Sequence, residues 1–256
     1  MRKIMGVGFA TLLEKEVLRF WKVSFQTLLA PLVSTLLYLV VFAQVLGQRD
    51  SIYPGISYAA FLVPGLVMMA MLQNAFANSS SSLVQSKVTG NLVFVLLTPL
   101  SEGEFFGAYV LAAMVRGIMV GSVVLIAAWL FFSLSVFSGV WILVFCLLST
   151  FMAGALGVLA GVWAEKFDQM AAWQNFLILP LTFLSGAFYS LHSLPPLWHL
   201  ISRFNPFFYA IDGFRYGFIG ASDVSPWSSL VIVGSTCLAL SWTTLALLRS
   251  GWRLRP

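Results

Sequence analysis

Long apolar runs, separated by short polar segments, dominate the pattern along the chain. Each run is about 20 residues long, which is enough for a helix to cross the hydrocarbon core of a bilayer. Backbone groups in lipid must be satisfied within the segment, so such spans are helical. We therefore expect an all-α integral membrane protein, a single domain over residues 1–256, with six transmembrane helices at about 25–46, 58–77, 117–137, 140–163, 171–190 and 227–248.

A different pattern precedes the first run. Over residues 8–22 apolar positions recur at helical spacing, with Glu14, Lys15, Arg19 and Lys22 on another side. This pattern predicts an N-terminal amphipathic helix lying in the membrane interface. The alternative is that these residues are only the charged flank of the first span.

Composition supports the membrane assignment and narrows the chemistry. Hydrophobic residues make up 60% of the chain and charged residues only 9%, whereas a soluble domain carries roughly a quarter charged residues. The net charge of +5 does not indicate nucleic acid, because the basic residues flank apolar runs. The sequence contains no P-loop, no H-E-x-x-H and no nucleophile motif. We expect no catalytic residue and no metal site, and we interpret Cys146 and Cys237 as packing residues.

The positions of lysine and arginine predict the topology. With both termini inside, the inner set is Arg2, Lys3, Lys15, Arg19, Lys22, Lys87, Arg116, Lys166, Arg249, Arg253 and Arg255. The outer set is Arg49, Arg203 and Arg215. The positive-inside rule then places both termini in the cytoplasm. In this scheme Arg116 lies at the edge of the third span, with its side chain reaching the interface.

The segment 78–104 is predicted to be the main cytoplasmic loop. It contains a serine run, the apolar hexamer "LVFVLL" at 92–97, and Thr98-Pro99. The hexamer is too short to span a membrane. It could form a short helix that docks into a partner's groove, or it could pack beneath its own bundle.

The segment 179–218, "LPLTFLSGAFYSLHSLPPLWHLISRFNPFFYAIDGFRYGF", is apolar but broken by glycine and proline. Non-helical backbone at membrane depth is tolerated only where protein buries it or where it lines a cavity. We therefore expect residues 191–226 to form short re-entrant helices in the outer leaflet, after the fifth span. Asp212 and Arg215, three apart on a helix, could form an ion pair, and His192 and His199 are interpreted as interfacial histidines.

Several stretches in order resemble the membrane subunits of type-2 ABC exporters, as found in bacterial inner membranes. They are "EKEVLRFW" at 14–21, "FLVPGLVMMAM" at 61–71, K-x-x-G-x-L…L-L-T-P-L at 87–100 and the segment 179–218. Within the last segment the matching residues are Gly186, Pro195, Asn205, Pro206, Tyr209, Gly213 and Arg215. The resemblance covers nearly the whole chain.

The resemblance implies a permease subunit that is not itself an enzyme. Two copies would form a twelve-span homodimer in membrane lipid, and two copies of a separate ABC-type ATPase would bind ATP and Mg²⁺, so that this chain needs no cofactor. It also implies that the loop after the second span receives the movement of the ATPase. The coupling residues would be Glu14, Arg19, Lys87, Gly90, Leu92, Val95, Leu96, Thr98 and Pro99. The family often has a carboxylate shortly after the loop glycine, where this chain has Val93 and Phe94.

The resemblance further implies an outer gate after the fifth span. Its residues would be Gly186, Pro195, Asn205, Pro206, Phe207, Phe208, Tyr209, Asp212 and Arg215.

Other functions remain open at this stage. A secondary transporter or channel without an ATPase is one alternative, and a membrane scaffold subunit is another. The absence of carboxylates in the middle of the predicted spans counts against ion coupling. The GxxxG pairs at Gly117–Gly121 and Gly157–Gly161 could pack helices within the chain or lie at the dimer seam.

Overall fold

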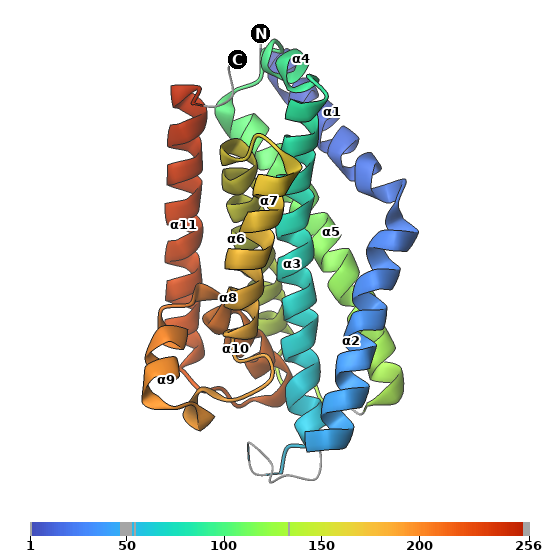
Figure 1. Ribbon diagram of the computed structural model, residues 1–256, viewed down its shortest axis with the longest axis vertical. Coiled ribbons are helices and arrows are strands. Elements are labelled where there is room, and N and C mark those ends of the chain that lie inside the picture. Colours follow the sequence, from blue (N-terminus) through green and yellow to red (C-terminus); the bar gives the residue numbers. More distant parts are fainter. Residues whose placement is uncertain (1, 47–52, 54, 133, 253–256) are drawn as a thin grey trace.

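A computed structural model describes residues 2–46, 53, 55–132 and 134–252, which fold into a bundle of helices (Figure 1). No strand occurs within these ranges. The long helices are α1 (Arg2–Trp21), α2 (Ser24–Leu46), α3 (Tyr58–Val88), α5 (Glu102–Phe131), α6 (Gly139–Trp163) and α11 (Pro226–Ser250). The short ones are α4 (Leu92–Leu96), α7 (Phe167–Trp173), the π-helix η1 (Gln174–Ile178), α8 (Leu179–Phe183), the 3₁₀-helix η2 (Leu191–Ser193), α9 (Pro196–Arg203) and α10 (Pro206–Ile219). Arg49, Arg253 and Arg255, used above for topology, lie outside the described residues.

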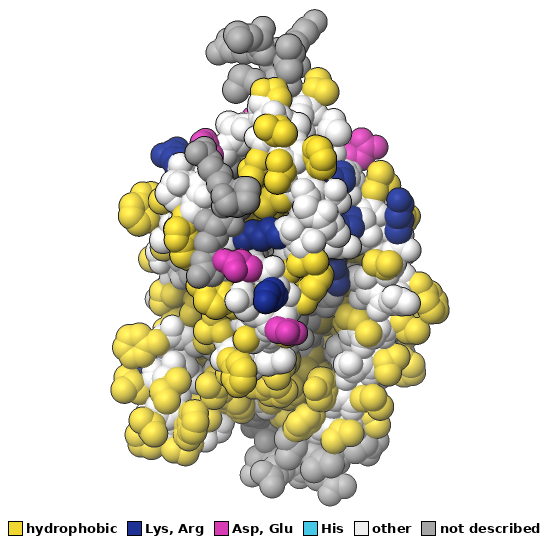
Figure 2. Space-filling model, turned by 45° about the horizontal axis from the view of Figure 1, so that its top comes forward, with side chains coloured by type: hydrophobic (Ala, Val, Ile, Leu, Met, Phe, Trp, Pro, Cys, Tyr) yellow, Lys and Arg dark blue, Asp and Glu magenta, His cyan; other side chains and the backbone are white. Residues whose placement is uncertain are grey.

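The two ends of the bundle differ in content. Helix α1 begins and α11 ends at the end where α4 lies, which we call the α4 end (Figure 1). Helices α9 and α10 lie at the opposite end, which we call the α10 end. Charged side chains gather toward the α4 end, whereas the surface farther down is mostly hydrophobic (Figure 2).

Helix α3 is the central element of the bundle. Ser57 caps its first turn, and most of its residues are buried against α5 and α6. Small residues allow the close approach: a Cβ at Gly157 would collide with the Phe76 carbonyl, and one at Gly117 would lie 3.0 Å from the Met71 carbonyl. Gly157 and Gly117, each the first residue of its GxxxG pair, therefore face α3 of the same chain.

Within the described part of the chain, five helices are long and apolar enough to cross a membrane, namely α2, α3, α5, α6 and α11. The fifth predicted span, at 171–190, is not confirmed as one continuous helix. The chain instead forms α7, one π turn and α8, and it leaves the helix after Phe183. Pro180 accounts for the irregularity, because it has no amide hydrogen and its ring displaces the carbonyl one turn earlier, within the π turn.

The predicted boundaries of the cytoplasmic loop are wrong. Helix α3 continues to Val88, and α5 begins at Glu102 behind a capping box formed by Ser101 and Glu104. The serine run stays helical because its hydroxyls find acceptors: Ser79 donates to the Gly154 carbonyl at 2.8 Å, and Ser80 to the Phe76 carbonyl at 2.8 Å. The non-helical connection therefore contains only 89–91 and 97–101, around α4.

The third span was also predicted to begin too late, at 117. Because α5 covers Glu102–Phe131, Arg116 lies in the middle of a long apolar helix, and the prediction that it lies at a span edge is wrong.

Candidate functional site

Helix α4 divides its residues between the core and the surface. Leu92 is only 4% exposed and belongs to a cluster with Leu12, Leu83, Phe105 and Leu248. Of the other apolar side chains of the hexamer, Val95 is partly buried against this cluster. Val93, Phe94, Leu96 and Leu97 are exposed, Phe94 by 71% and Leu97 by 77%. Leu92 and Val95 thus anchor the short helix, and the other side chains form an uncovered apolar surface.

Two pockets flank α4. One, of about 360 Å³, lies between α4, the start of α5 and the end of α11, and its lining includes Val93, Leu96 and Leu248. The other, of about 510 Å³, lies between α4 and α1, and its lining includes Val7, Thr11 and Phe94. Val95 and Leu100 line both pockets, so α4 forms the ridge between them.

The connections around α4 are held by local bonds. Gly90 has a φ of +73° and donates its N–H to the Lys87 carbonyl at 3.0 Å, which ends α3 with a sharp turn. The Thr98 hydroxyl donates to the Val95 carbonyl, and Pro99 is exposed. The Lys87 ammonium donates to the Val162 and Ala164 carbonyls, at 2.5 and 3.0 Å, and so caps the end of α6.

Helix α1 is tied to α3 by a buried polar network. Glu16 is completely buried and forms ion pairs with Arg19 at 3.3 Å and with Lys15 at 3.1 Å. It also accepts a hydrogen bond from the Ser82 hydroxyl at 2.5 Å. The Arg19 guanidinium donates to the backbone and side-chain oxygens of Asn78, at 2.8 and 3.0 Å. Glu14, in contrast, is exposed.

At the α10 end, Arg215 is fully buried in α10. Its guanidinium donates to the Phe61 carbonyl at 3.2 Å and to the Gly186 carbonyl at 2.6 Å, and it lies 3.7 Å from the centre of the Phe61 ring. Gly186 has a φ of +72°, which glycine adopts without strain. Arg215 thereby joins α10, α3 and the segment after α8.

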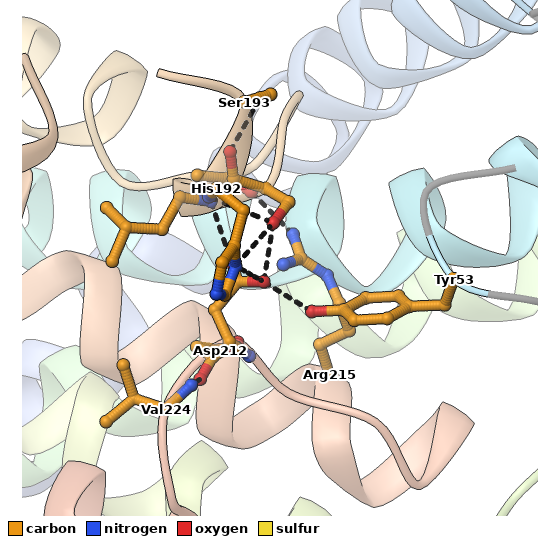
Figure 3. Close-up of polar contacts among 10 residues, drawn as sticks. Tyr53, His192, Ser193, Asp212, Arg215 and Val224 are labelled. Atoms are coloured by element: carbon orange, nitrogen blue, oxygen red, sulfur yellow. Dashed lines mark hydrogen bonds and ion pairs between the residues drawn. The ribbon is translucent and has the colours of Figure 1, made fainter. Parts of the chain in front are cut away.

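The predicted ion pair between Asp212 and Arg215 is not formed. Asp212 instead accepts the backbone N–H groups of Asp223 and Val224, at 2.9 and 3.1 Å, which fixes the loop after α10. Figure 3 shows Asp212 and Arg215 on either side of a hydrogen-bond cluster that includes Tyr53 and His192.

Asp223 is the centre of that cluster. It accepts the Tyr53 hydroxyl at 2.5 Å, the Ser190 hydroxyl at 2.6 Å and the Leu191 N–H at 2.6 Å, and it lies 3.4 Å from His192. Burial opposes its ionisation, but the bonds from Ser190, Tyr53 and Leu191 outweigh burial and hold the pKa of Asp223 below its ordinary value. Burial and the bond to Asp223 raise the pKa of Tyr53, so the phenol stays protonated.

Of the other residues proposed for the outer gate, most are buried, whereas Pro195 is exposed and Pro206 is partly buried. Phe207 and Phe208 are buried. The Asn205 side chain accepts the Phe207 N–H at 3.0 Å and donates to the Leu181 carbonyl at 2.7 Å, so it caps α10 and ties it to α8. Tyr209 donates to the Arg203 carbonyl at 2.8 Å. Pro195 caps α9 and Pro206 occupies the first turn of α10, where a missing amide hydrogen costs nothing.

Known proteins are similar in sequence to most of this chain. The family model of the ABC-2 type transporter matches residues 7–219, from α1 through α10. The chain belongs to the ABC-2 type transporter family. The inner membrane transport permease YadH of Escherichia coli K12 is 35% identical over 224 residues, 88% of each chain. Nodulation protein J of Rhizobium meliloti is 24% identical over 218 residues, 84% of this chain and 83% of that protein.

Membership of the ABC-2 family makes this protein a membrane transport permease of the multi-pass, inner-membrane type that is not itself the catalyst. For this permease the sequence interpretation missed three buried polar residues, Glu16, Asn78 and Ser82. A signal for the first was present, since Leu12, Glu16 and Phe20 follow one another at the four-residue spacing of a single helix face. All three of those side chains are buried.

Proposed function

We propose that this ABC-2 permease forms the translocation path of an ATP-driven exporter as a homodimer, with a separate ABC-type ATPase docking on the α4 end. The observation that carries the proposal is the exposed apolar surface of α4, held by buried Leu92 and flanked by two pockets. A contiguous apolar surface at the charged end of a molecule is typical of a protein interaction site. Two copies of the ATPase would bind ATP and Mg²⁺, and this chain would bind neither.

The α4 end would face the cytoplasm. Lys15, Arg19 and Lys87 belong to α1 and α3, which both reach that end, and the positive-inside rule favours the cytoplasmic side for it. Helices α9 and α10 would then lie at the outer leaflet and serve as the re-entrant gate, with membrane lipid around them.

Docking at α4 would act on two elements at once. The larger pocket is lined by residues of both α1 and α4, and α1 is bound to α3 through Arg19 and Asn78. An ATPase that contacts Phe94 and the wall of this pocket would therefore move α1, α3 and α4 together. Transport requires that the ATPase bind two packings of the permease with different affinity.

Co-purification tests the docking step. The permease would be expressed with candidate ABC-type ATPases from the same genome, and the complex captured through the ATPase. We expect Phe94→Asp and Leu96→Asp to abolish capture, because each places a charge in an apolar contact. Phe167→Asp, which alters an exposed aromatic residue at the start of α7, is the matched control and should retain capture.

Native mass spectrometry of the captured complex would give its composition, expected to be two permease and two ATPase copies. Capture that survives both α4 substitutions would show that α4 is not the docking surface. A secondary transporter or scaffold function would instead give no ATPase complex with the unaltered chain.

A further inference from the structure

Arg116 is a partly buried cation on α5 with no anionic partner among the described residues. It lies mid-way along α5, and its Nη2 donates to the Asn74 Oδ1 of α3 at 3.4 Å. Its Nε is buried and has no hydrogen-bond partner. The ion pairs among the described residues involve the carboxylates of Glu16 and Asp223, and none of these pairs includes Arg116.

An unpaired cation of this kind lowers the stability of a membrane protein. An ionised side chain at membrane depth costs several kcal/mol unless it is paired, and intramembrane ionisable groups usually mark ligand or ion paths. The one Asn74 contact, at 3.4 Å, is long for a charge-assisted bond. Arg116 therefore has unused capacity to bind an anion.

A cavity of about 210 Å³ lies next to Asn74, the residue to which Arg116 donates its hydrogen bond. It lies between α2 and α3, and Asn74 is part of its wall. The other polar groups of the wall are Ser34, Thr35, Tyr38 and Gln73. Gln73 in turn donates to the Thr182 hydroxyl of α8 at 3.1 Å, so two residues of the cavity wall connect α3 to its neighbours, Asn74 to α5 and Gln73 to α8.

The cavity is small and its surroundings are apolar. Since one water occupies about 30 Å³ in the liquid, the volume suits a group the size of a phosphate or carboxylate but not a chain of sugars. Helix α2, which forms one wall, exposes Val33 and Leu37 on its outer surface. A molecule whose charged group lies in the cavity would place an apolar tail along such residues.

We propose that the cavity between α2 and α3, together with Arg116, binds the phosphate or carboxylate group of an amphipathic molecule within the membrane plane. This inference deepens the proposed transport function by naming a substrate class. Arg116 would supply the charge, and Asn74, Gln73, Ser34 and Thr35 the hydrogen bonds. The Asn74 side chain would rotate away from Arg116, and the anionic group of the ligand would replace it as the hydrogen-bond partner of the guanidinium.

Binding by the full-length chain alone tests this proposal, and no ATPase is needed. The chain would be placed in phosphatidylcholine nanodiscs, and thermal unfolding would be followed during titration with lysophosphatidic acid, lysophosphatidylcholine or inorganic phosphate. We expect lysophosphatidic acid to raise Tm at concentrations at least tenfold lower than lysophosphatidylcholine does. Arg116→Gln should remove this preference, Arg116→Lys should keep most of it, and Arg249→Gln, at an exposed helix end, should leave it unchanged.

The arms separate the sources of the anion. Protection by inorganic phosphate at similar concentrations, lost in Arg116→Gln, would support an anion site that takes the free ion. Protection by lysophosphatidic acid alone would support an amphipathic ligand. An equal response of Arg116→Gln and the unaltered chain would overturn the proposal.

A second pair of variants covers the case in which neither Arg116 variant folds. Ser34→Ala combined with Thr35→Val should weaken the lysophosphatidic acid response at least threefold, whereas Ser235→Ala, an exposed serine of α11, should not. An unchanged response of the double variant would contradict the proposed cavity. Failure here would leave ATPase capture through α4 unaffected, so the two proposals fail independently.

Discussion

The Arg19 guanidinium binds both oxygens of Asn78, at 2.8 and 3.0 Å, across 59 residues of sequence. One side chain thus fixes the N-terminal helix to the central helix of the bundle. The same guanidinium pairs with Glu16, which is completely buried.

Arg19→Gln should destabilise the permease markedly. Removing one partner of a buried ion pair costs about 3–5 kcal/mol when the charge left behind is fully buried and unpaired. The loss should be smaller here, because Arg19 is partly exposed and Glu16 keeps its ion pair with Lys15. We expect a clearly lower Tm in detergent. Lys22→Gln, just beyond α1, removes an exposed charge and should leave Tm unchanged. In the Glu16→Gln background the Arg19→Gln loss should shrink, and equal losses in both backgrounds would contradict the pairing.

Leu92 and Phe94, two residues apart on α4, should respond oppositely. Leu92→Ala removes a buried side chain and should cost about 2–4 kcal/mol of unfolding free energy. Phe94→Ala alters an exposed side chain and should change stability by less than about 0.5 kcal/mol, while weakening ATPase capture. Chemical unfolding and capture, measured on the same preparations, check both effects. Equal stability losses would show that Phe94 is part of the core.

Two glycine-to-alanine changes should have opposite signs. Gly157 in α6 meets the Phe76 carbonyl, so an added methyl group would force the helices apart at a cost of about 1–3 kcal/mol. Gly234 in α11 has open space around it, and alanine there should gain about 0.5–1 kcal/mol from helix preference. Thermal unfolding of the two variants provides the comparison. A stable Gly157→Ala variant would mean that α6 and α3 are not in close contact.

Arg215→Lys should not behave as a conservative change. The ammonium cannot reach two carbonyls in the geometry of the guanidinium fork or stack on the Phe61 ring. The loss should be about 2–3 kcal/mol, since one buried carbonyl would be left unpaired. Arg203→Lys, on the exposed part of α9, is the control and should be neutral. Equal Tm values for the two variants would contradict the role assigned to Arg215.

The all-helical class and most of the long helices could be predicted from the sequence, because hydrophobic length alone decides them. The family was also correctly expected from its ordered motifs. The boundaries of the loop at 78–104 could not be predicted from the sequence. Whether the serine run forms a loop or a helix depends on acceptors far away in the chain, such as the Gly154 carbonyl. The prediction of a continuous fifth span failed for a related reason. Hydropathy contains no information about the effect of Pro180 on the helical hydrogen bonds.

The two proposed sites differ in how far sequence reasoning reached. The segment around α4 was found, but spacing alone could not separate buried Leu92 from exposed Phe94. Arg116 was assigned to a span edge because α5 was begun too late, and its place opposite Asn74 becomes visible only when α3 and α5 are seen together. The Asp212–Arg215 pair failed because backbone groups of Asp223 and Val224 occupy the carboxylate.

Helix α3 is 31 residues long, or about 45 Å at 1.5 Å per residue. Pro64, near the α10 end, has no backbone N–H and so cannot make the helical hydrogen bond at its position. From Pro64 to Val88 the helix contains no further proline and is expected to be rigid. Under the proposed coupling, a displacement of the turn around α4 would be carried along α3 to the wall of the Asn74 cavity. Helices α7 and α8, which both contact α3, are joined by the π turn of Gln174–Ile178, where the regular helical hydrogen bonding is interrupted. A continuous helix would thus carry a displacement from the α4 end to a neighbour whose own helix is already interrupted, and that interruption is where we expect the rearrangement to occur.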